Sequence, residues 1–188
     1  MVNTGDYMAS TETVYIERKN KNIKAIVECF EERQNKVYTY GDYSDLDFSR
    51  CALAHIEFHY SKFCRSNLNY ASLNGSTLIG VNFNNACMEN SCLDNCFIFE
   101  ADFSYAILRN ASFVNVSGRA GLLNYNNWCF VGFLPVSFRH ADLTNADFTG
   151  ADLTGADFTG AILYGADFTD SVLDGAIFTS SIGKELGK

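Results

Sequence analysis

Residues Ala141–Phe178 read ADLTN ADFTG ADLTG ADFTG AILYG ADFTD SVLDG AIF, and this stretch decides the fold. The sequence repeats every five residues: Ala or Ser opens each pentad, Leu or Phe stands at its centre, and small or polar residues close it. An α-helix turns by about 500° over five residues, so the central Leu and Phe residues would not share a face. In a straight strand, residues five apart point to opposite faces. A chain that turns a corner once per pentad can bury every centre, because each new side faces the same axis.

The same frame extends backwards through most of the chain. From Tyr43 to Phe178 there are 28 pentads, and Gly118 is the one centre that is not apolar. The position two residues before each centre is small or apolar almost throughout, and Asn126 is the exception. An insertion would escape notice only if its length were a multiple of five, so we expect no long inserted loop.

This pattern resembles the pentapeptide-repeat family, whose repeat is (Ala/Ser/Thr/Val)-(Asp/Asn)-(Leu/Phe)-(Ser/Thr/Arg)-Gly. The resemblance implies an all-β fold, a right-handed quadrilateral parallel β-helix with about twenty residues per coil. At four pentads per coil, 28 pentads predict about seven coils. With about 4.8 Å between stacked strands, the rod would be roughly 34 Å long.

The repeat divides the chain into three parts. Residues 41–180 are predicted to form the β-helix, residues 1–40 an N-terminal cap segment, and residues 181–188 a C-terminal tail. A cap is expected because the end of a β-helix exposes unpaired backbone and core side chains. The tail is short for a capping helix, so the last coil is either left partly open or covered by a second copy, as a homodimer through a coil end.

One zone, residues 116–130, is irregular. The unbroken frame places Leu123 after Phe103 on one side of the coil and Trp128 after Leu108 on the next. Gly118 leaves a gap among the centres, and two interpretations remain open. Either Trp128 fills the space beside Gly118, or a local bulge or loop forms around residues 117–121.

Composition argues against several classes of protein. There is no run of about 18 apolar residues and no basic start followed by an apolar stretch, so we expect no membrane span and no secretory signal. The seven Cys include no pair twenty residues apart, which argues against a ladder of disulfides, and none has zinc-site spacing. The expectation is a cytoplasmic protein in a reducing compartment.

The sequence offers no candidate for catalysis, cofactor or metal binding. His55 and His59 are close in sequence but fall on different sides of the coil. No nucleophile elbow is found, and no Gly-rich phosphate loop lies between a strand and a helix. Because a rod with a filled interior has no pocket that excludes water, we expect a protein that is not an enzyme.

Charge is the first candidate functional feature. Residues 1–40 are neutral, whereas residues 41–188 carry sixteen acidic and eight basic side chains and so the whole net charge of −8. In the most regular part, an Asp precedes the centre and is expected to point outward, at Asp142, Asp147, Asp152, Asp157 and Asp167. These Asp residues either keep the rod soluble and support its corners, or make it a negative rod that occupies a basic DNA-binding groove.

Apolar side chains are the second candidate feature. Ile79 and Phe99 are consecutive outward positions on one side of the predicted coil, and Phe97 lies beside them. Clustered exposed aromatic residues often mark partner sites. The alternative is that these side chains pack against the N-terminal segment or a crystal neighbour.

The resemblance implies two classes of function. Some members of the family resemble B-form DNA, bind type II topoisomerases (DNA gyrase or topoisomerase IV) and protect them, which confers antibiotic resistance. We therefore expect a DNA mimic with a protein partner, which binds neither nucleic acid nor a membrane. The alternative is an interaction scaffold or secreted bacterial effector that binds its partner through one face of the β-helix.

Overall fold

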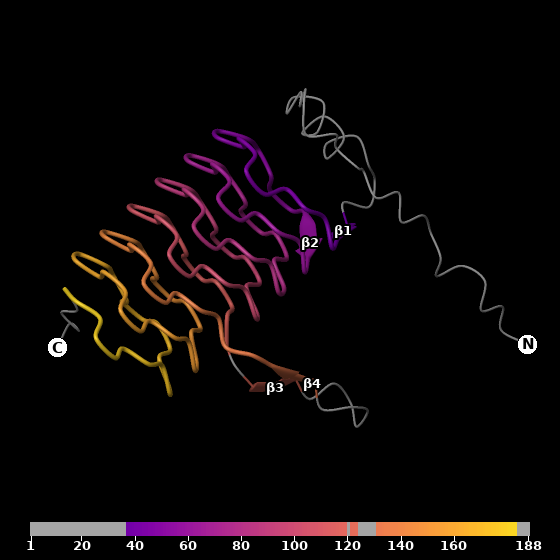
Figure 1. Ribbon diagram of the computed structural model, residues 1–188. Helices are drawn as coiled ribbons and strands as arrows, with labels where there is room; N and C mark the ends of the chain where they lie inside the picture. Colours follow the sequence, from indigo (N-terminus) through magenta and orange to yellow (C-terminus); the bar gives the residue numbers. More distant parts are fainter. Residues whose placement is uncertain (1–36, 120, 124–130, 184–188) are drawn as a thin grey trace, which may run out of the picture.

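The computed structural model describes residues 37–119, 121–123 and 131–183, which wind into a rod of stacked coils (Figure 1). Four short strands are present: β1 (Val37–Thr39), β2 (Glu57–His59), β3 (Gly121–Leu123) and β4 (Val131–Phe133). Strand β1 pairs in parallel with β2, and the rest of the ladder consists of single parallel bridges. The described part of the chain contains no helix, and hence none that could cross a membrane.

The bridges give the coil its length. Asp47 is paired with Asn67, and Asn67 with Cys87, so each coil has twenty residues. The amide of Phe48 donates to the carbonyl of Asn67 at 2.7 Å, and the amide of Asn67 donates back to the carbonyl of Leu46 at 2.8 Å. Four pentads therefore make one coil, which confirms that the chain turns once per pentad.

Each corner is a tight turn. The amide of Cys51 donates to the carbonyl of Phe48 at 3.1 Å, and Arg50 between them has a φ of 62°, as the third residue of a type II turn requires. A side chain at a corner leans over the corner of the next coil. A Cβ at Gly160, for example, would lie 2.4 Å from Nδ1 of His140, so Gly at this corner leaves room for the His140 ring.

The pentad centres form the core. The described centres from Phe48 to Phe113 and from Phe138 to Phe158 are fully buried, and aromatic rings among them stack from coil to coil. Phe103 lies 5.0 Å from Phe83 and 5.1 Å from Phe138, measured between ring centroids, with nearly parallel planes. One side of the rod is thus an aromatic column, made of Tyr43, Phe63, Phe83, Phe103, Phe138, Phe158 and Phe178.

A hairpin interrupts the coil, contrary to the expectation that no loop is inserted. Asp102 pairs with Ser137 and Ser117 pairs with Asp152, so the register steps by 35 residues instead of twenty. The fifteen extra residues leave the rod, and β3 and β4 pair antiparallel beside it (Figure 1). Because fifteen is three pentads, the sequence frame continues through the insertion unchanged.

The insertion changes which residues stack. Phe138, and not Leu123, follows Phe103 on its side of the coil. On the next side Leu108 donates its amide to the carbonyl of Asp142, so Leu143 takes the place predicted for Trp128. The predicted stacks were therefore wrong beyond residue 118, because three apolar centres in the insertion matched the frame by their spacing alone.

The space beside Gly118 is filled from within the coil. A Cβ at Gly118 would lie 2.8 Å from Cγ1 of Ile98 and 3.1 Å from Cγ1 of Val136. These two side chains occupy the space that was proposed for Trp128, which itself lies outside the described residues. Of the two interpretations of this zone, the register supports the loop.

The ladder begins before the predicted boundary at residue 41, because Val37–Thr39 already pairs with the next coil. At the other end it extends to Ile182, which pairs with Ile162. The cap itself was predicted for residues 1–40, of which 1–36 lie outside the described chain. The cap, the right-handed sense and the total of seven coils stay predictions.

We expect the coil to tolerate removal of the hairpin. Deleting residues 121–135 joins Ala120 to Val136 and leaves pentads of ordinary length on both sides. Since the bridges from Asp102 to Ser137 and from Ser117 to Asp152 do not involve the deleted residues, the free energy of unfolding should change by about 1 kcal/mol or less. Circular dichroism during urea unfolding measures this change.

A deletion one residue shorter, of residues 122–135, is the matched control. It leaves a six-residue pentad, so the chain must bulge at that corner and stability should fall. If the two deletions unfold at the same urea concentration, the coil does not depend on the five-residue frame at this corner.

Candidate protein-binding surface

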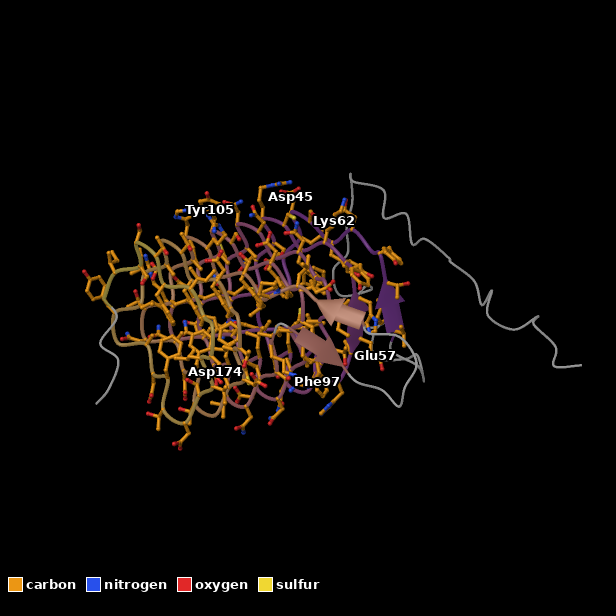
Figure 2. All side chains as sticks on the ribbon, turned by 90° about the horizontal axis from the view of Figure 1, so that it is seen from below. Asp45, Glu57, Lys62, Phe97, Tyr105 and Asp174 are labelled. Carbon is orange, nitrogen blue, oxygen red and sulfur yellow. The ribbon has the colours of Figure 1, made fainter. Side chains whose placement is uncertain are left out.

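The outer surface has four sides, which we number from the centres of one coil: side one carries Phe103, side two Leu108, side three Phe113 and side four Gly118. Residues flanking a centre point outward, and those twenty residues apart form columns along the rod. Glu57, Phe97 and Asp174 belong to side four and lie along one edge of the rod in Figure 2, whereas the opposite edge shows Asp45, Lys62 and Tyr105.

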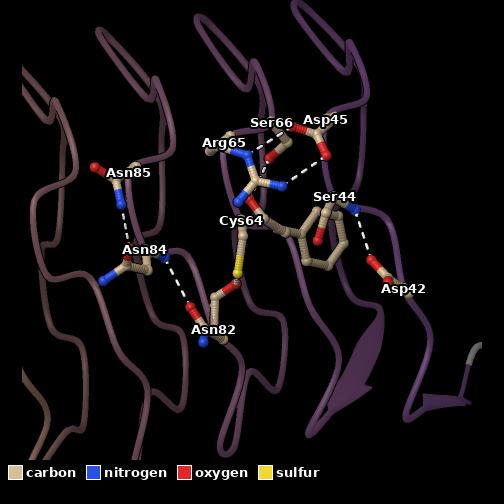
Figure 3. Close-up of polar contacts among 10 residues, drawn as sticks. Asp42, Ser44, Asp45, Cys64, Arg65, Ser66, Asn82, Asn84 and Asn85 are labelled. Atoms are coloured by element: carbon tan, nitrogen blue, oxygen red, sulfur yellow. Dashed lines mark hydrogen bonds and ion pairs between the residues drawn. The ribbon is translucent and has the colours of Figure 1, made fainter.

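Outward Asp residues support the corners. Oδ1 of Asp147 accepts hydrogen bonds from the amide of Thr149 at 2.8 Å and from its hydroxyl at 2.6 Å. Asn does the same in other coils, since Oδ1 of Asn82 accepts from the amide of Asn84 at 2.8 Å (Figure 3). The hydrogen bonds support a structural role for Asp at this position, and they show that Asn can fill it.

Two of the five predicted Asp residues are neutralised within the chain. Asp142 is 2.7 Å from Nε of Arg109, and Asp157 is 2.7 Å from Nη1 of Arg139. Burial raises the pKa of Asp142, but hydrogen bonds from Thr144 and Arg109 outweigh this effect and hold that pKa below its ordinary value. These two carboxylates, on sides two and one, are therefore poor candidates for contact with a partner.

The other three predicted Asp residues lie on sides three and four. Asp147 and Asp167 are paired in successive coils of side three, and Asp152 lies on side four. Two residues that the sequence analysis did not select complete the surface, Asp170 at the corner between these sides and Asp174 on side four. We call this set the acidic strip: Asp147, Asp152, Asp167, Asp170 and Asp174.

The acidic strip keeps its charge. None of its five carboxylates forms an ion pair within the described part of the chain. Hydrogen bonds from the hydroxyl and amide of Thr169 lower the pKa of Asp167, so this group stays ionised at neutral pH. Residues 137–183 carry seven carboxylates against one Arg.

The coils before the hairpin are more evenly charged. Residues 37–119 carry eight carboxylates and five basic side chains. Arg65 makes two hydrogen bonds to the carboxylate of Asp45, at 2.7 and 2.8 Å, on the corner between sides one and two (Figure 3). The net negative charge of the described rod is therefore larger beyond the hairpin, where seven carboxylates and one Arg give −6, than before it, where eight carboxylates and five basic side chains give −3.

The predicted apolar patch is smaller than the sequence suggested. Phe97 is 48% exposed and Ile79 is half-buried, but Phe99 is only 7% exposed, so the expectation that it is open to a partner was wrong. The ring of Phe99 stacks on Phe97 at 6.0 Å, one coil before Gly118, where the hairpin leaves the rod. Phe97 is thus the main exposed aromatic residue of this patch.

The reactive side chains of the described coil are buried or scattered. No group of three His, Cys, Asp or Glu residues in the described chain could hold a metal ion. The thiol of Cys96 donates a hydrogen bond to the carbonyl of Leu73 at 3.0 Å, and burial raises the pKa of this thiol to about 12. A thiol with that pKa is not a nucleophile at neutral pH. The surface offers charge and shape for binding.

Comparison with known proteins identifies the family. Residues 56–95 and 141–180 match the family model described as pentapeptide repeats, in eight copies. The chain is a pentapeptide-repeat protein. Pentapeptide-repeat proteins are generally structural or binding proteins and not enzymes.

Solved structures of pentapeptide-repeat proteins match the chain at low sequence identity, and the first of them shares its fold. A trypsin-treated variant of QnrB1, a plasmid-mediated fluoroquinolone resistance protein, is 16% identical with a TM-score of 0.54, over 82% of this chain and 79% of that one. HetL from Nostoc sp. strain PCC 7120, involved in heterocyst differentiation regulation, is 17% identical with a TM-score of 0.26, over 87% of this chain and 97% of that one. Rfr23 from the cyanobacterium Cyanothece 51142 is 23% identical with a TM-score of 0.27, over 65% of this chain and 64% of that one. No curated protein matches the chain significantly.

Proposed function

We propose that this pentapeptide-repeat protein is a non-catalytic binding protein that acts as an acidic DNA mimic towards a type II topoisomerase, such as DNA gyrase, and protects it from inhibitors. The acidic strip is the observation that carries the proposal. The likeness of the coil to QnrB1, which is described as a fluoroquinolone resistance protein, supports this choice of target.

Electrostatics explains how such a rod would compete with DNA. Duplex DNA carries one phosphate charge per about 1.7 Å of its axis, and the proteins that bind it neutralise these charges with Lys and Arg. In the acidic strip, Asp147 and Asp167 are paired in successive coils, whose backbones lie about 4.8 Å apart. A basic groove would attract this surface over a distance of roughly one Debye length, about 8 Å at physiological ionic strength.

The proposal also limits the partners. The acidic strip repels phosphate, so the rod binds protein and not nucleic acid directly. DNA gyrase and topoisomerase IV act on cytoplasmic DNA, and the proposed location is accordingly the cytoplasm.

The experiment is a supercoiling assay with purified DNA gyrase and the full chain. We expect the protein to inhibit supercoiling at micromolar concentration by competing with DNA, and to lose inhibition when the five residues of the acidic strip are replaced by Asn. Asn is suitable because Asn67 and Asn82 already accept the corner hydrogen bond in this chain.

The matched control removes the same amount of charge before the hairpin, by Asp42→Asn, Asp47→Asn, Glu57→Gln, Glu89→Gln and Asp102→Asn. This variant should still inhibit, since the acidic strip is intact. No inhibition by the unaltered protein would exclude the DNA-mimic proposal, and equal loss in both variants would exclude the acidic strip as its site.

The exposed ring of Phe97 favours a second candidate, an interaction scaffold or secreted effector that binds a partner through side four. The column of Phe97 holds Thr77 and Ser117 in the adjacent coils, so Phe97→Ser should leave the coil intact. Under the first proposal, Phe97→Ser still inhibits gyrase as well as the unaltered protein. If Phe97→Ser abolishes inhibition while the Asn variant of the acidic strip retains it, the exposed ring of Phe97 and not the acidic strip is the binding site.

A further inference from the structure

Side two carries exposed apolar side chains at the positions that flank its centres. We call these residues the apolar face: Ile107, Ile162, Tyr164 and Ile182. Ile107 is 36% exposed, Tyr164 57% and Ile182 49%, while Ile162 is half-buried. The three Ile residues belong to one column along the rod. The apolar face is separate from the patch around Phe97, because side two lies opposite side four.

The carboxylate in the middle of the apolar face is paired. Asp142 stands in the column between Ile107 and Ile162, and it lies 2.7 Å from Nε of Arg109. The side chain of Asp142 is only 15% exposed, whereas that of Arg109 is 53% exposed. A partner on this face would therefore meet a guanidinium group at this height, which a neutral polar side chain can contact.

The two borders of the apolar face differ in chemistry. Towards side one, the rings of Tyr105 and His140 stack at 4.9 Å along the corner. Towards side three, beyond an uncharged corner at Asn145, stand Asp147 and Asp167, which form no ion pair within the described part of the chain. The face thus has an aromatic border on one flank and a negative one on the other.

We infer that the apolar face binds an amphipathic α-helix of a partner protein, with basic residues along the flank that faces side three. The flat part of one side spans three residues, or roughly 10 Å, which is similar to the diameter of a helix, about 10–12 Å. Successive coils lie about 4.8 Å apart, and successive helical turns about 5.4 Å apart. A helix parallel to the rod axis can therefore place one apolar side chain against each coil.

Charge complementarity selects this partner. Lys and Arg have long side chains that can cross the corner at Asn145 and approach Asp147 and Asp167. A second copy of this chain has the same net charge of −8 and would be repelled, whereas a basic helix would be attracted. Binding should accordingly weaken as the salt concentration rises.

The test uses a labelled synthetic peptide of about four helical turns, with Leu along one stripe, Lys along one adjacent flank and Gln elsewhere. Fluorescence anisotropy measures its binding to the full chain. We expect saturable binding at micromolar concentrations. A peptide of the same composition, with its Leu residues spread around the helix, should bind at least about tenfold more weakly, because it has no apolar stripe.

Substitutions of apolar residues locate the site. Ile107→Asn with Ile162→Asn should weaken binding about tenfold or more. Asn is suitable because Asn67 stands in the same column, where its Oδ1 accepts the corner hydrogen bond. The matched control, Val172→Asn with Ile177→Asn, removes two exposed apolar side chains at the same pentad position on sides four and one, and it should leave binding unchanged.

Substitutions of carboxylates test the basic flank. Asp147→Asn with Asp167→Asn should weaken binding about threefold or more and reduce its dependence on salt. Asp152→Asn with Asp174→Asn removes the same charge from side four, which is farther from the apolar face, and should weaken binding less than about twofold.

Several results would overturn the inference: no saturable binding of the peptide, an equal loss in the two variants with altered apolar residues, or an equal loss in the two variants with altered carboxylates. It would also be overturned if Ile107→Asn with Ile162→Asn changed the mass of the chain in sedimentation equilibrium but not its affinity for the peptide. The apolar face would then be a contact between copies of this chain. Because the peptide has no gyrase sequence, the outcome is independent of the proposed DNA mimicry.

Discussion

Replacing Phe103 with Asp should lower the free energy of unfolding by about 5 kcal/mol or more. Phe103 is fully buried in the middle of the aromatic column, between Phe83 and Phe138, and it packs edge-to-face on Phe113 at 5.7 Å. Asp would remove all three ring contacts and place a carboxylate where no hydrogen-bond partner is available. Because each coil contacts only its neighbours, the loss should divide the rod into two poorly coupled halves.

Urea unfolding followed by circular dichroism measures the effect, with Phe103→Leu as the control. Leu occupies centres elsewhere in the coil and should cost only about 1–1.5 kcal/mol. If Phe103→Asp unfolded at the same urea concentration as Phe103→Leu, the assignment of pentad centres to the core would be untenable.

Gly118→Leu should also destabilise the coil, by about 1–3 kcal/mol, although Leu is a preferred centre of the repeat. The space beside Gly118 is already occupied by two side chains. Cγ1 of Ile98 would lie 2.8 Å from the new Cβ, and Cγ1 of Val136 would be nearly as close. The repeat pattern alone would predict that Gly118→Leu stabilises the coil, because it would treat Gly118 as an empty position.

A double-mutant cycle separates overpacking from other effects of the substitution. Ile98→Ala opens the space, so Ile98→Ala with Gly118→Leu should cost less than the sum of the two single changes. Additive costs would show that Gly118 is required for its backbone and not for the room it leaves.

The coil could be predicted from the sequence because its period leaves few alternatives. One large side chain every five residues, from Tyr43 onwards, fits no straight helix or strand, and the ladder confirms the frame up to Gly118. The hairpin could not be recognised from spacing, since its fifteen residues carry apolar residues at the expected centres. The weak signals were local: Gly118 at a centre, Asn126 at a small or apolar position, and Pro135.

The candidate surface was predicted less well, because side-chain pairing depends on which coils are neighbours. The ion pair between Arg109 and Asp142 joins residues 33 apart, a separation that exists only because the hairpin intervenes. Asp170 and Asp174, in contrast, could have been placed beside Asp147, Asp152 and Asp167 by counting four pentads per coil, because all five residues follow the hairpin. Nothing in the repeat pattern indicated that Phe99 would be buried.

In a coil of twenty residues, the position of a residue in the sequence fixes both the side of the rod on which it lies and its height along the axis. Adding or removing one pentad inside the coil would rotate all later residues by a quarter turn relative to all earlier ones, whatever the change in sequence. Had the fifteen residues of the hairpin been wound into the rod, the acidic strip would face three quarters of a turn from its present direction relative to Phe97. Keeping them outside preserves the alignment of the two halves, so insertions can vary in length while the direction of each surface is retained.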